Sequence, residues 1–385
     1  MNSTWWVKQE DLDDDQKKVI QLPLDGSFAI YGPPGSGKTN LLLLRANYLS
    51  LANRPNVLIL SFTRSLKEFI ISGAHRYSFS TEKIKTYHRW AHDFLRENGI
   101  LFSSSGNFTD IRSELQIALQ NLIANERISD VYDAILLDEA QDYTGEEINI
   151  LNTLAKDIYA VGDLRQRIFQ PNSSIEILKT LTNEQIELKY HYRNGLKICK
   201  FADGLNKSPG AYPSLEHTSN YNETELPSSV TRHKCATLEE QFSKIEEKII
   251  DQSIAYPDEL IGIVCPRRND LNTLANLLRQ TSFASKCTIQ NSDEYISLTD
   301  DTNICLLTIH SAKGLEFRAL HIAACNTLNR FPLNRNMLFT AATRAKTSLD
   351  IYHENDLSGY IESALVPFEP IDHLPTVKDA FGRTK

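Results

Sequence analysis

The sequence lacks several features that would place it in large classes of proteins. Its six cysteines, at positions 199, 235, 265, 287, 305 and 325, form no C-x-x-C pair and have no histidine partner at metal-ligand spacing. We interpret them as buried or incidental thiols of a reducing cytoplasm. No apolar run approaches the ~20 residues that span a bilayer. The first residues also lack the basic and apolar pattern of a signal peptide, so we expect a cytoplasmic protein.

Charge and length exclude less. The net charge of −8 argues against a broad cationic surface, although local basic stripes can coexist with it. The 385 residues suit two or three domains, and 41% apolar residues suffice for ordinary cores. No internal repeat recurs at a fixed period. Composition alone therefore gives no indication of a nucleic-acid partner.

A complete phosphate-binding loop is present near the start of the chain. Residues 32–39 read Gly-Pro-Pro-Gly-Ser-Gly-Lys-Thr, which is G-x-x-x-x-G-K-[ST]. The apolar run 28–31 before it predicts a buried strand, and a helix is predicted over 38–51. This context argues against a chance glycine-rich turn and predicts a nucleoside triphosphate site. Its residues are Gly32, Pro33, Pro34, Gly35, Ser36, Gly37, Lys38 and Thr39.

Within that loop, two side chains have direct roles. Lys38 is expected to reach the β- and γ-phosphates, and the Thr39 hydroxyl to hold Mg²⁺. The glycines let backbone N–H groups turn onto phosphate oxygens, and the helix N-terminus adds its dipole.

A pair of carboxylates ends a second predicted strand, over 134–138. Asp138 is expected to hold Mg²⁺ through water, and Glu139 to polarise the water that attacks the γ-phosphate. In isolation the same pattern could be a strand ending in a solvated acidic turn. Together with the phosphate loop it predicts hydrolysis of ATP.

Strand-like and helical runs alternate along the chain, which predicts an α/β fold with parallel sheets. Further strands are predicted at 57–62, 158–162, 260–265, 305–309, 319–323 and 349–352. Further helices are predicted at 66–72, 112–125, 239–252, 269–279 and 336–343. Residues 206–227 are rich in Pro, Ser, Asn and Gly and predict a surface loop.

A second α/β unit follows residue 190, yet the phosphate loop occurs once. We therefore expect one nucleotide between two similar lobes, of which one carries the loop and the other carries arginines. This is the arrangement of a nucleic-acid motor.

A series of short motifs extends this expectation. They lie at residues 13–16, 61–64, 86–88, 138–142, 162–169, 192–193, 308–317 and 340–346. Their content and order resemble superfamily 1 helicases of the UvrD/Rep/PcrA type. The stretch Thr-Ile-His-Ser-Ala-Lys-Gly-Leu-Glu-Phe at 308–317 is the most specific of them.

The resemblance implies roles around ATP. Gln16 would read adenine, Tyr192 would stack on it, and Glu316 would accept a hydrogen bond from a ribose hydroxyl. Arg193 and Arg344 would supply two cations from the second lobe, so that hydrolysis requires the lobes to close. Either arginine alone could equally be a surface ion pair.

The resemblance also implies how the site communicates with a strand. Gln166 would contact the γ-phosphate and report its loss to the strand-binding side. Stacking of bases on aromatic rings tolerates any base sequence. The alternative for each aromatic residue is packing in the core. The implied strand contacts are Phe62, Thr63, Tyr87, His88, Phe169 and His310.

The resemblance further implies two RecA-like P-loop domains in tandem, with the ATP site at their interface. We expect the first domain at 1–185, with a small helical insertion at about 95–130. The second is expected at 186–366, followed by a tail at 367–385. The family's mobile 2B subdomain has no room here. Pro171 replaces a second aromatic residue, and Asn40 replaces an arginine.

Three classes of function remain open on the sequence alone. The first is an ATP-dependent translocase or helicase that moves 3′ to 5′ along single-stranded nucleic acid, DNA in preference to RNA. The second is a regulatory ATPase subunit of a nuclease or anti-phage defence complex. The third is a nucleotide-binding module without a nucleic-acid role. The expected cofactors are ATP and Mg²⁺. The expected partners are a single strand and, in the second class, a nuclease or another protein, with no membrane partner.

Overall fold

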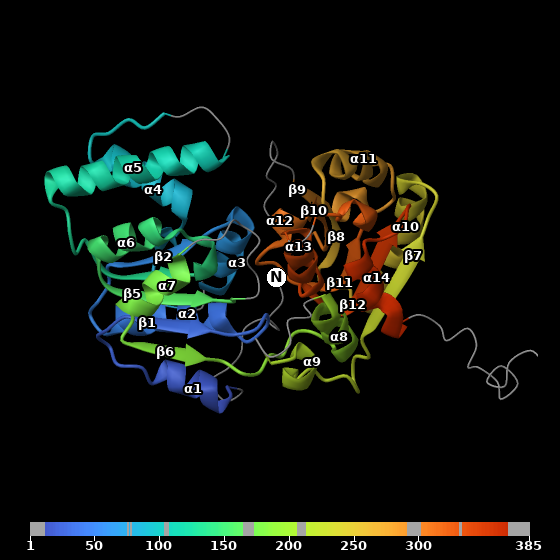
Figure 1. Cartoon of the computed structure of the whole chain (residues 1–385), viewed down its shortest axis with the longest axis horizontal. Helices are drawn as coiled ribbons and strands as arrows, with labels where there is room; N and C mark the ends of the chain where they lie inside the picture. The colour runs from blue at the N-terminus through green and yellow to red at the C-terminus, as the bar shows by residue number, and fades with distance from the viewer. Residues whose placement is uncertain are drawn as a thin grey trace, which may run out of the picture.

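The chain folds into two lobes, each built on one six-stranded parallel sheet (Figure 1). The computed structural model describes residues 12–74, 77, 79–103, 108–164, 173–205, 213–290, 302–330 and 333–368. The fold is α/β with two RecA-like domains in tandem, which confirms the fold predicted from the sequence.

The first sheet has the strand order β3-β2-β4-β5-β1-β6. Its strands are β1 (Phe28–Tyr31), β2 (Val57–Ser61), β3 (Ile84–Thr86), β4 (Tyr132–Leu137), β5 (Ala155–Gly162) and β6 (Glu184–Glu187). The helices of this lobe are α1 (Asp14–Ile20), α2 (Lys38–Leu51), α3 (Arg64–Ala74), α4 (Tyr87–Glu97), α5 (Phe108–Glu126), α6 (Gly145–Leu154) and α7 (Ser174–Leu181).

The second sheet has the strand order β7-β12-β11-β8-β10-β9. Its strands are β7 (Ser229–Lys234), β8 (Ile261–Cys265), β9 (Cys287–Gln290), β10 (Ile304–Thr308), β11 (Phe317–Ile322) and β12 (Ala345–His353). Its helices are α8 (Leu196–Leu205), α9 (Leu215–Thr218), α10 (Leu238–Ala255), α11 (Arg268–Leu278), α12 (Ile309–Ala312), α13 (Leu333–Ala342) and α14 (Gly359–Leu365).

Helices cover both faces of each sheet, so successive residues of a central strand enter different cores. In β2, Leu58 and Leu60 pack with α4, α5 and α6, whereas Val57 and Ile59 pack with α2 and α3. In the second lobe, α8, α13 and α14 cover one face, and α10 and α11 cover the other. Such strands are apolar along their whole length, which is why the sequence reveals them.

The predicted elements and the observed ones agree best in these buried parts. The helix predicted at 38–51 has the bounds of α2. The edge strands β6 and β7 were not predicted, because most of their side chains are polar and half-exposed or exposed. The domain boundary predicted after residue 185 falls inside β6, which belongs to the first sheet. The predicted loop at 206–227 contains the short helix α9, whose Leu215 is buried.

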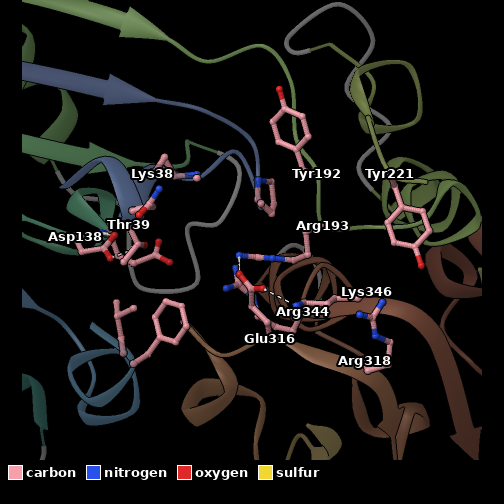
Figure 2. A pocket seen from close by; sticks show the side chains of 18 of the residues that line it. Lys38, Thr39, Asp138, Tyr192, Arg193, Tyr221, Glu316, Arg318, Arg344 and Lys346 are labelled. Carbon is pink, nitrogen blue, oxygen red and sulfur yellow. Dashed lines mark hydrogen bonds and ion pairs between the residues drawn. The ribbon is translucent and has the colours of Figure 1, made fainter. Parts of the chain in front are cut away.

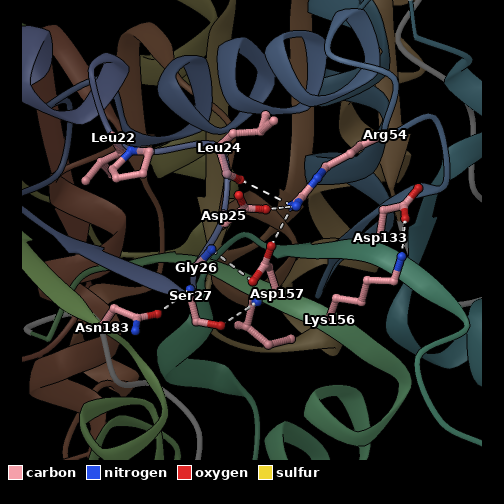
Figure 3. Close-up of polar contacts among 12 residues, drawn as sticks. Leu22, Leu24, Asp25, Gly26, Ser27, Arg54, Asp133, Lys156, Asp157 and Asn183 are labelled. Atoms are coloured by element: carbon pink, nitrogen blue, oxygen red, sulfur yellow. Dashed lines mark hydrogen bonds and ion pairs between the residues drawn. The ribbon is translucent and has the colours of Figure 1, made fainter.

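A polar network secures the first sheet at the end opposite the phosphate loop (Figure 3). Arg54 forms ion pairs with Asp25 and with Asp157 of β5, the latter at 2.7 Å. Asp157 Oδ1 accepts a hydrogen bond from Gly26 N at 3.0 Å. Ser27 N donates to Asn183 Oδ1 at 2.7 Å. These contacts fix the entry of β1 beside its neighbours β5 and β6.

Within the insertion predicted at about 95–130, the described residues after α4 form one α-helix, α5. Leu115, Leu119 and Leu122 on the inner face of α5 are buried in the core that α4 and α6 share. In the described part of the second lobe, the elements between residues 196 and 308 all pack on the second sheet or on each other. Among the described residues, no helix is long and apolar enough to cross a membrane.

If α5 is part of the first core, Leu119→Ala will lower the free energy of unfolding by about 2–5 kcal/mol, because it leaves a cavity. Urea denaturation followed by tryptophan fluorescence measures this, since Trp5, Trp6 and Trp90 all precede the second lobe. The control is Ile117→Ala on the outer face, which is 56% exposed and should change stability by less than ~0.5 kcal/mol. Equal effects of the two substitutions would contradict the packing of α5.

Candidate ATP site between the lobes

The phosphate loop joins β1 to α2, and two glycines with left-handed backbones shape it. Gly35 and Gly37 have φ angles of 77° and 82°, which other residues rarely adopt. A Cβ on Gly35 would also collide with the Cβ of Arg193. The loop therefore lies directly against the segment that leads into the second lobe.

Lys38 points back into the loop. Its Nζ donates hydrogen bonds to Gly32 O and Pro33 O, both at 2.8 Å. Burial lowers the pKa of Lys38, and the charges of Asp163 and Glu139 partly offset this effect. The ammonium is thus held inside the loop that a triphosphate would fill.

Gln16 and Tyr192 line the cavity that Lys38 also faces, beside the phosphate loop. Gln16 Nε2 donates to Ser36 O at 3.0 Å, and its Oε1 accepts from Asp13 N at 3.1 Å. The Tyr192 hydroxyl donates to Asp13 Oδ2 at 2.6 Å. Both side chains lie beside the phosphate loop, and Gln16 also holds the loop. Their roles toward adenine remain predictions.

Two oxygen ligands suitable for Mg²⁺ lie side by side. Thr39 Oγ1 donates to Asp138 Oδ2 at 2.8 Å, and Asp138 Oδ1 accepts from Glu139 N at 2.8 Å. Burial, together with the charge of Glu139, raises the pKa of Asp138 to about 6. A hard cation would favour the ionised carboxylate, and one hydroxyl with one carboxylate suits Mg²⁺, which keeps several waters. These residues fit the metal that the sequence predicts.

Glu139 is held in a constrained position beside them. Its backbone has a φ of 50°, which is uncommon for a residue with a side chain. Gln141 Nε2 donates to Glu139 Oε2, and Gln141 Oε1 accepts from Asp163 N at 3.0 Å. Burial alone would raise the pKa of Glu139, but the charges of Lys313, Arg344 and Lys38 lower it to about 2. The carboxylate is therefore ionised, and its role in polarising a water remains a prediction.

A cluster of cations comes from the segment before α8, which carries Arg193, and from the start of β12, with Arg344 directly before the strand and Lys346 within it. Arg193 forms an ion pair with Glu316, whose carboxylate also lies 3.5 Å from Lys346 Nζ. Arg344 is buried and donates from Nε to Thr340 O at 3.2 Å. Burial and the charge of Arg193 lower the pKa of Arg344 to about 10, so it stays protonated at neutral pH. Glu316 is occupied by two cations here, and its role toward a ribose remains a prediction.

These groups face one cavity of about 330 Å³ between the lobes (Figure 2). Lys38, Thr39 and Asp138 lie on one side, and Arg193 and Arg344 lie opposite them. The cavity thus places the predicted phosphate-binding, metal-binding and arginine residues around one space.

A buried ion pair joins the lobes next to this cavity. Lys313, 1% exposed, follows α12, and its Nζ lies 2.5 Å from Asp142 Oδ2 and 3.6 Å from Glu139 Oε2. Beside it, Gly314 packs so closely on Leu66 of α3 that a Cβ would lie 2.8 Å from the Leu66 side chain. The motif at 308–317 therefore docks against the end of the first lobe that carries Asp142 and Glu139.

Two family models match the chain. The model of an AAA domain matches residues 16–171, and the model of the UvrD-like helicase C-terminal domain matches residues 303–352. The first match contains the phosphate loop and Glu139, and the second contains Lys313 and Arg344. The chain is therefore similar to UvrD-like helicases of superfamily 1. This confirms the resemblance seen in the motifs and, at a coarse level, a helicase-type ATPase.

Among the solved structures that match is that of the PRRSV helicase, with 16% identity over 88% of this UvrD-like chain and 54% of that chain, and with a TM-score of 0.43. The UvrD-like chain thus spans about half the length of that relative. No conclusion about function follows from a likeness of this size. None of the curated proteins matches the chain.

The prediction that Tyr87 of the UvrD-like chain contacts a nucleic-acid strand was wrong. Its side chain is 1% exposed and packs edge-to-face on Tyr143, with ring centroids 5.7 Å apart. Thr86 caps α4, so the residue that follows turns into the core. Phe62 is half-buried, with the Arg112 guanidinium 5.0 Å from its ring centroid. Tyr87 is therefore a core residue, whereas the role of Phe62 toward a nucleic-acid strand remains a prediction.

Three other predicted strand contacts lie near the surface or the lobe interface. Thr63 Oγ1 caps α3 by accepting from Leu66 N at 3.2 Å. His88 is half-buried, and burial with the nearby charge of Arg112 lowers its pKa to about 4. His310 on α12 is exposed. Their roles toward a strand remain predictions, and Gln166, Phe169 and Pro171 lie outside the described residues.

Sequence reasoning missed several residues that line or support the site. Lys313 lies within a quoted motif, but its partner Asp142 is distant in sequence, so no local signal shows the pair. Gln141 also lies within a motif without an assigned role. Tyr221 and Arg318 line the cavity, and Tyr221 belongs to the segment predicted as a loop.

Arg344→Ala should lower kcat for ATP hydrolysis by about 10³-fold or more, because a cation opposite the phosphate loop acts on the transition state. Nucleotide affinity should change little. Steady-state kinetics measure the first, and isothermal titration with a non-hydrolysable analogue measures the second. The control is Arg232→Ala, whose side chain pairs with Glu362 away from the cavity. Lost affinity with a normal kcat would make Arg344 a binding residue instead.

Proposed function

We propose that this chain is an ATP-dependent nucleic-acid translocase of the helicase type. It hydrolyses ATP between its lobes and moves along a single strand, 3′ to 5′ and on DNA in preference to RNA. The observation that carries the proposal is the shared cavity. Lys38 and Glu139 enter it from the first lobe, and Arg193 and Arg344 from the second.

The chemistry that these residues support is positioning and charge stabilisation. Lys38 neutralises charge on the phosphates from within the loop. Mg²⁺, held by Thr39 and Asp138, would supply a further positive charge at the phosphate oxygens. Glu139, ionised and fixed by Gln141, polarises the attacking water.

Closure of the lobes completes the site. Arg344 belongs to the second lobe and Arg193 to the segment that leads into it, so Arg344 reaches a phosphate on the first lobe only when the lobes meet. Nucleotide binding and release would therefore bias an equilibrium between open and closed lobes. Repeated cycles would move the lobes along a strand held by residues such as Thr63 and His310, with Phe169 as the proposed stacking ring.

The compact architecture favours a specific limit on this activity. Among the described residues, the predicted insertion in the first lobe adds α5 after α4, and the elements of the second lobe pack on one sheet or on each other. We therefore expect translocation with weak unwinding of duplexes. The same trimming supports the second candidate, a regulatory ATPase subunit in a nuclease or defence complex.

The rate of ATP hydrolysis without nucleic acid, with single-stranded DNA and with single-stranded RNA tests the proposal. We expect stimulation by a single strand, stronger with DNA. Glu139→Gln is the control for the site: it should keep nucleotide binding but abolish hydrolysis, because the water loses its polarising carboxylate. A wild-type rate that no strand changes would contradict the motor. Undiminished turnover in Glu139→Gln would contradict the site.

A further inference from the structure

A second cavity, of about 750 Å³, lies on the first lobe between α3 and α4 and the segment after α4. Arg64 and Lys67 line it from α3, and Arg89 and Arg96 line it from α4. None of these four residues belongs to the lining of the ATP cavity. The cavity is therefore a separate site.

The sequence of α4 explains why basic side chains meet there. Trp90 and Phe94 are buried in the core of the first lobe. Arg89 and Arg96 point away from that core and are mostly exposed. Helical spacing thus separates an apolar face from a basic one.

Cations outnumber carboxylates in the described lining, with four Arg and Lys side chains against Glu68 and Asp93. Asp93 is shared, because Lys85, Arg89 and Arg96 all lie within 3.1–3.2 Å of its oxygens. One carboxylate cannot neutralise three cations. On a chain with a net charge of −8, this is a local basic patch that composition conceals.

Apolar and aromatic groups border the cations. Leu101 is 90% exposed, and the ring of Phe102 contacts that of His92 edge-on, with centroids 5.1 Å apart. All three residues line the cavity. Cations next to exposed apolar and aromatic surface are the combination that holds a phosphate backbone and its bases together.

The cavity is continuous with residues predicted to touch the nucleic-acid strand. His88, one of these predicted contacts, lines the cavity together with its motif neighbour Thr86. Thr63, another predicted contact, immediately precedes Arg64. An acidic protein segment would also match the cations. Binding such a segment would require neither an aromatic ring beside the cations nor a connection to the predicted strand contacts. The observations therefore favour nucleic acid.

We propose that the cavity between α3 and α4 binds the phosphodiester backbone of the nucleic acid beyond the predicted motif contacts. Arg89 and Arg96 bind phosphates, and Phe102 contacts a base. The proposal rests on the proposed function, since it extends the path of the same strand. It assigns to α4 part of the grip that a larger insertion would otherwise supply.

The test compares two double variants. Arg89→Ala with Arg96→Ala removes both phosphate ligands, and Asp93 keeps Lys85 as a partner, so the fold should persist. The matched control is Lys156→Ala with Lys234→Ala, which makes the same change of charge. These lysines are largely exposed, and each pairs with one carboxylate away from the cavity.

The measured quantities are the strand concentration for half-maximal ATPase and its dependence on salt. Each phosphate contact on a single strand contributes about 0.7 to the salt slope, so losing two should reduce the slope by about 1.4. At ~0.1 M salt this corresponds to about a 25-fold weaker strand affinity. The control double variant and the ATPase without a strand should both match wild type.

Strand length and form distinguish the source of the phosphates. With a DNA too short to reach beyond the motif residues, the two double variants should behave alike. With a longer DNA, the arginine variant should be weaker. If the arginine variant loses affinity only for a tailed duplex, the cavity binds the duplex part and not the single strand.

The inference and the proposed function can fail separately. If no strand stimulates the wild type, the proposed function fails and this inference fails with it. If strands stimulate the wild type but the arginine variant binds every strand and tailed duplex as the control does, only this inference is overturned. Binding of an acidic protein alone would then remain as the use of the patch.

Discussion

A buried ion pair between Lys313 and Asp142 joins the two lobes beside the predicted ATP site. The ammonium of Lys313, carried by the second lobe, is paired with Asp142 and lies close to Glu139 on the first lobe. Breaking a buried ion pair leaves an uncompensated charge and costs about 3–5 kcal/mol. The lobes therefore meet in the arrangement that pairs these charges. That arrangement also brings Arg193 and Arg344 to the cavity opposite the phosphate loop.

The same short segment connects two sides of the protein. His310 is exposed on α12, and Lys313, directly after that helix, is buried beside the carboxylate of Glu139. A strand that contacts the exposed side and a nucleotide that fills the cavity would both bias the position of one rigid element. Coupling through such an element requires only that each ligand favour the docked state.

The sequence was most informative where structure is local or buried. The fully apolar strands, the phosphate loop and the bounds of α2 follow from periodicity and motif chemistry. Polar edge strands such as β6 have no apolar pattern in the sequence. They form strands because they pair with a neighbouring strand, which for β6 is β1. The motif around Tyr87 predicted a contact with the nucleic-acid strand. However, Thr86 caps α4, and the side chain of Tyr87 turns into the core of the first lobe. The pairing of Lys313 with Asp142 is a contact distant in sequence, so only the fold reveals it.

The account depends on this contact between the lobes, and a double-mutant cycle on kcat tests it most directly. Lys313→Met, Asp142→Asn and the double variant would be compared at saturating ATP and strand, after circular dichroism shows that each is folded. If the pair acts as one unit, each single substitution lowers kcat by about tenfold or more, and the double variant loses no more than the worse single one. Losses that multiply, or a wild-type kcat in Lys313→Met, would contradict the account.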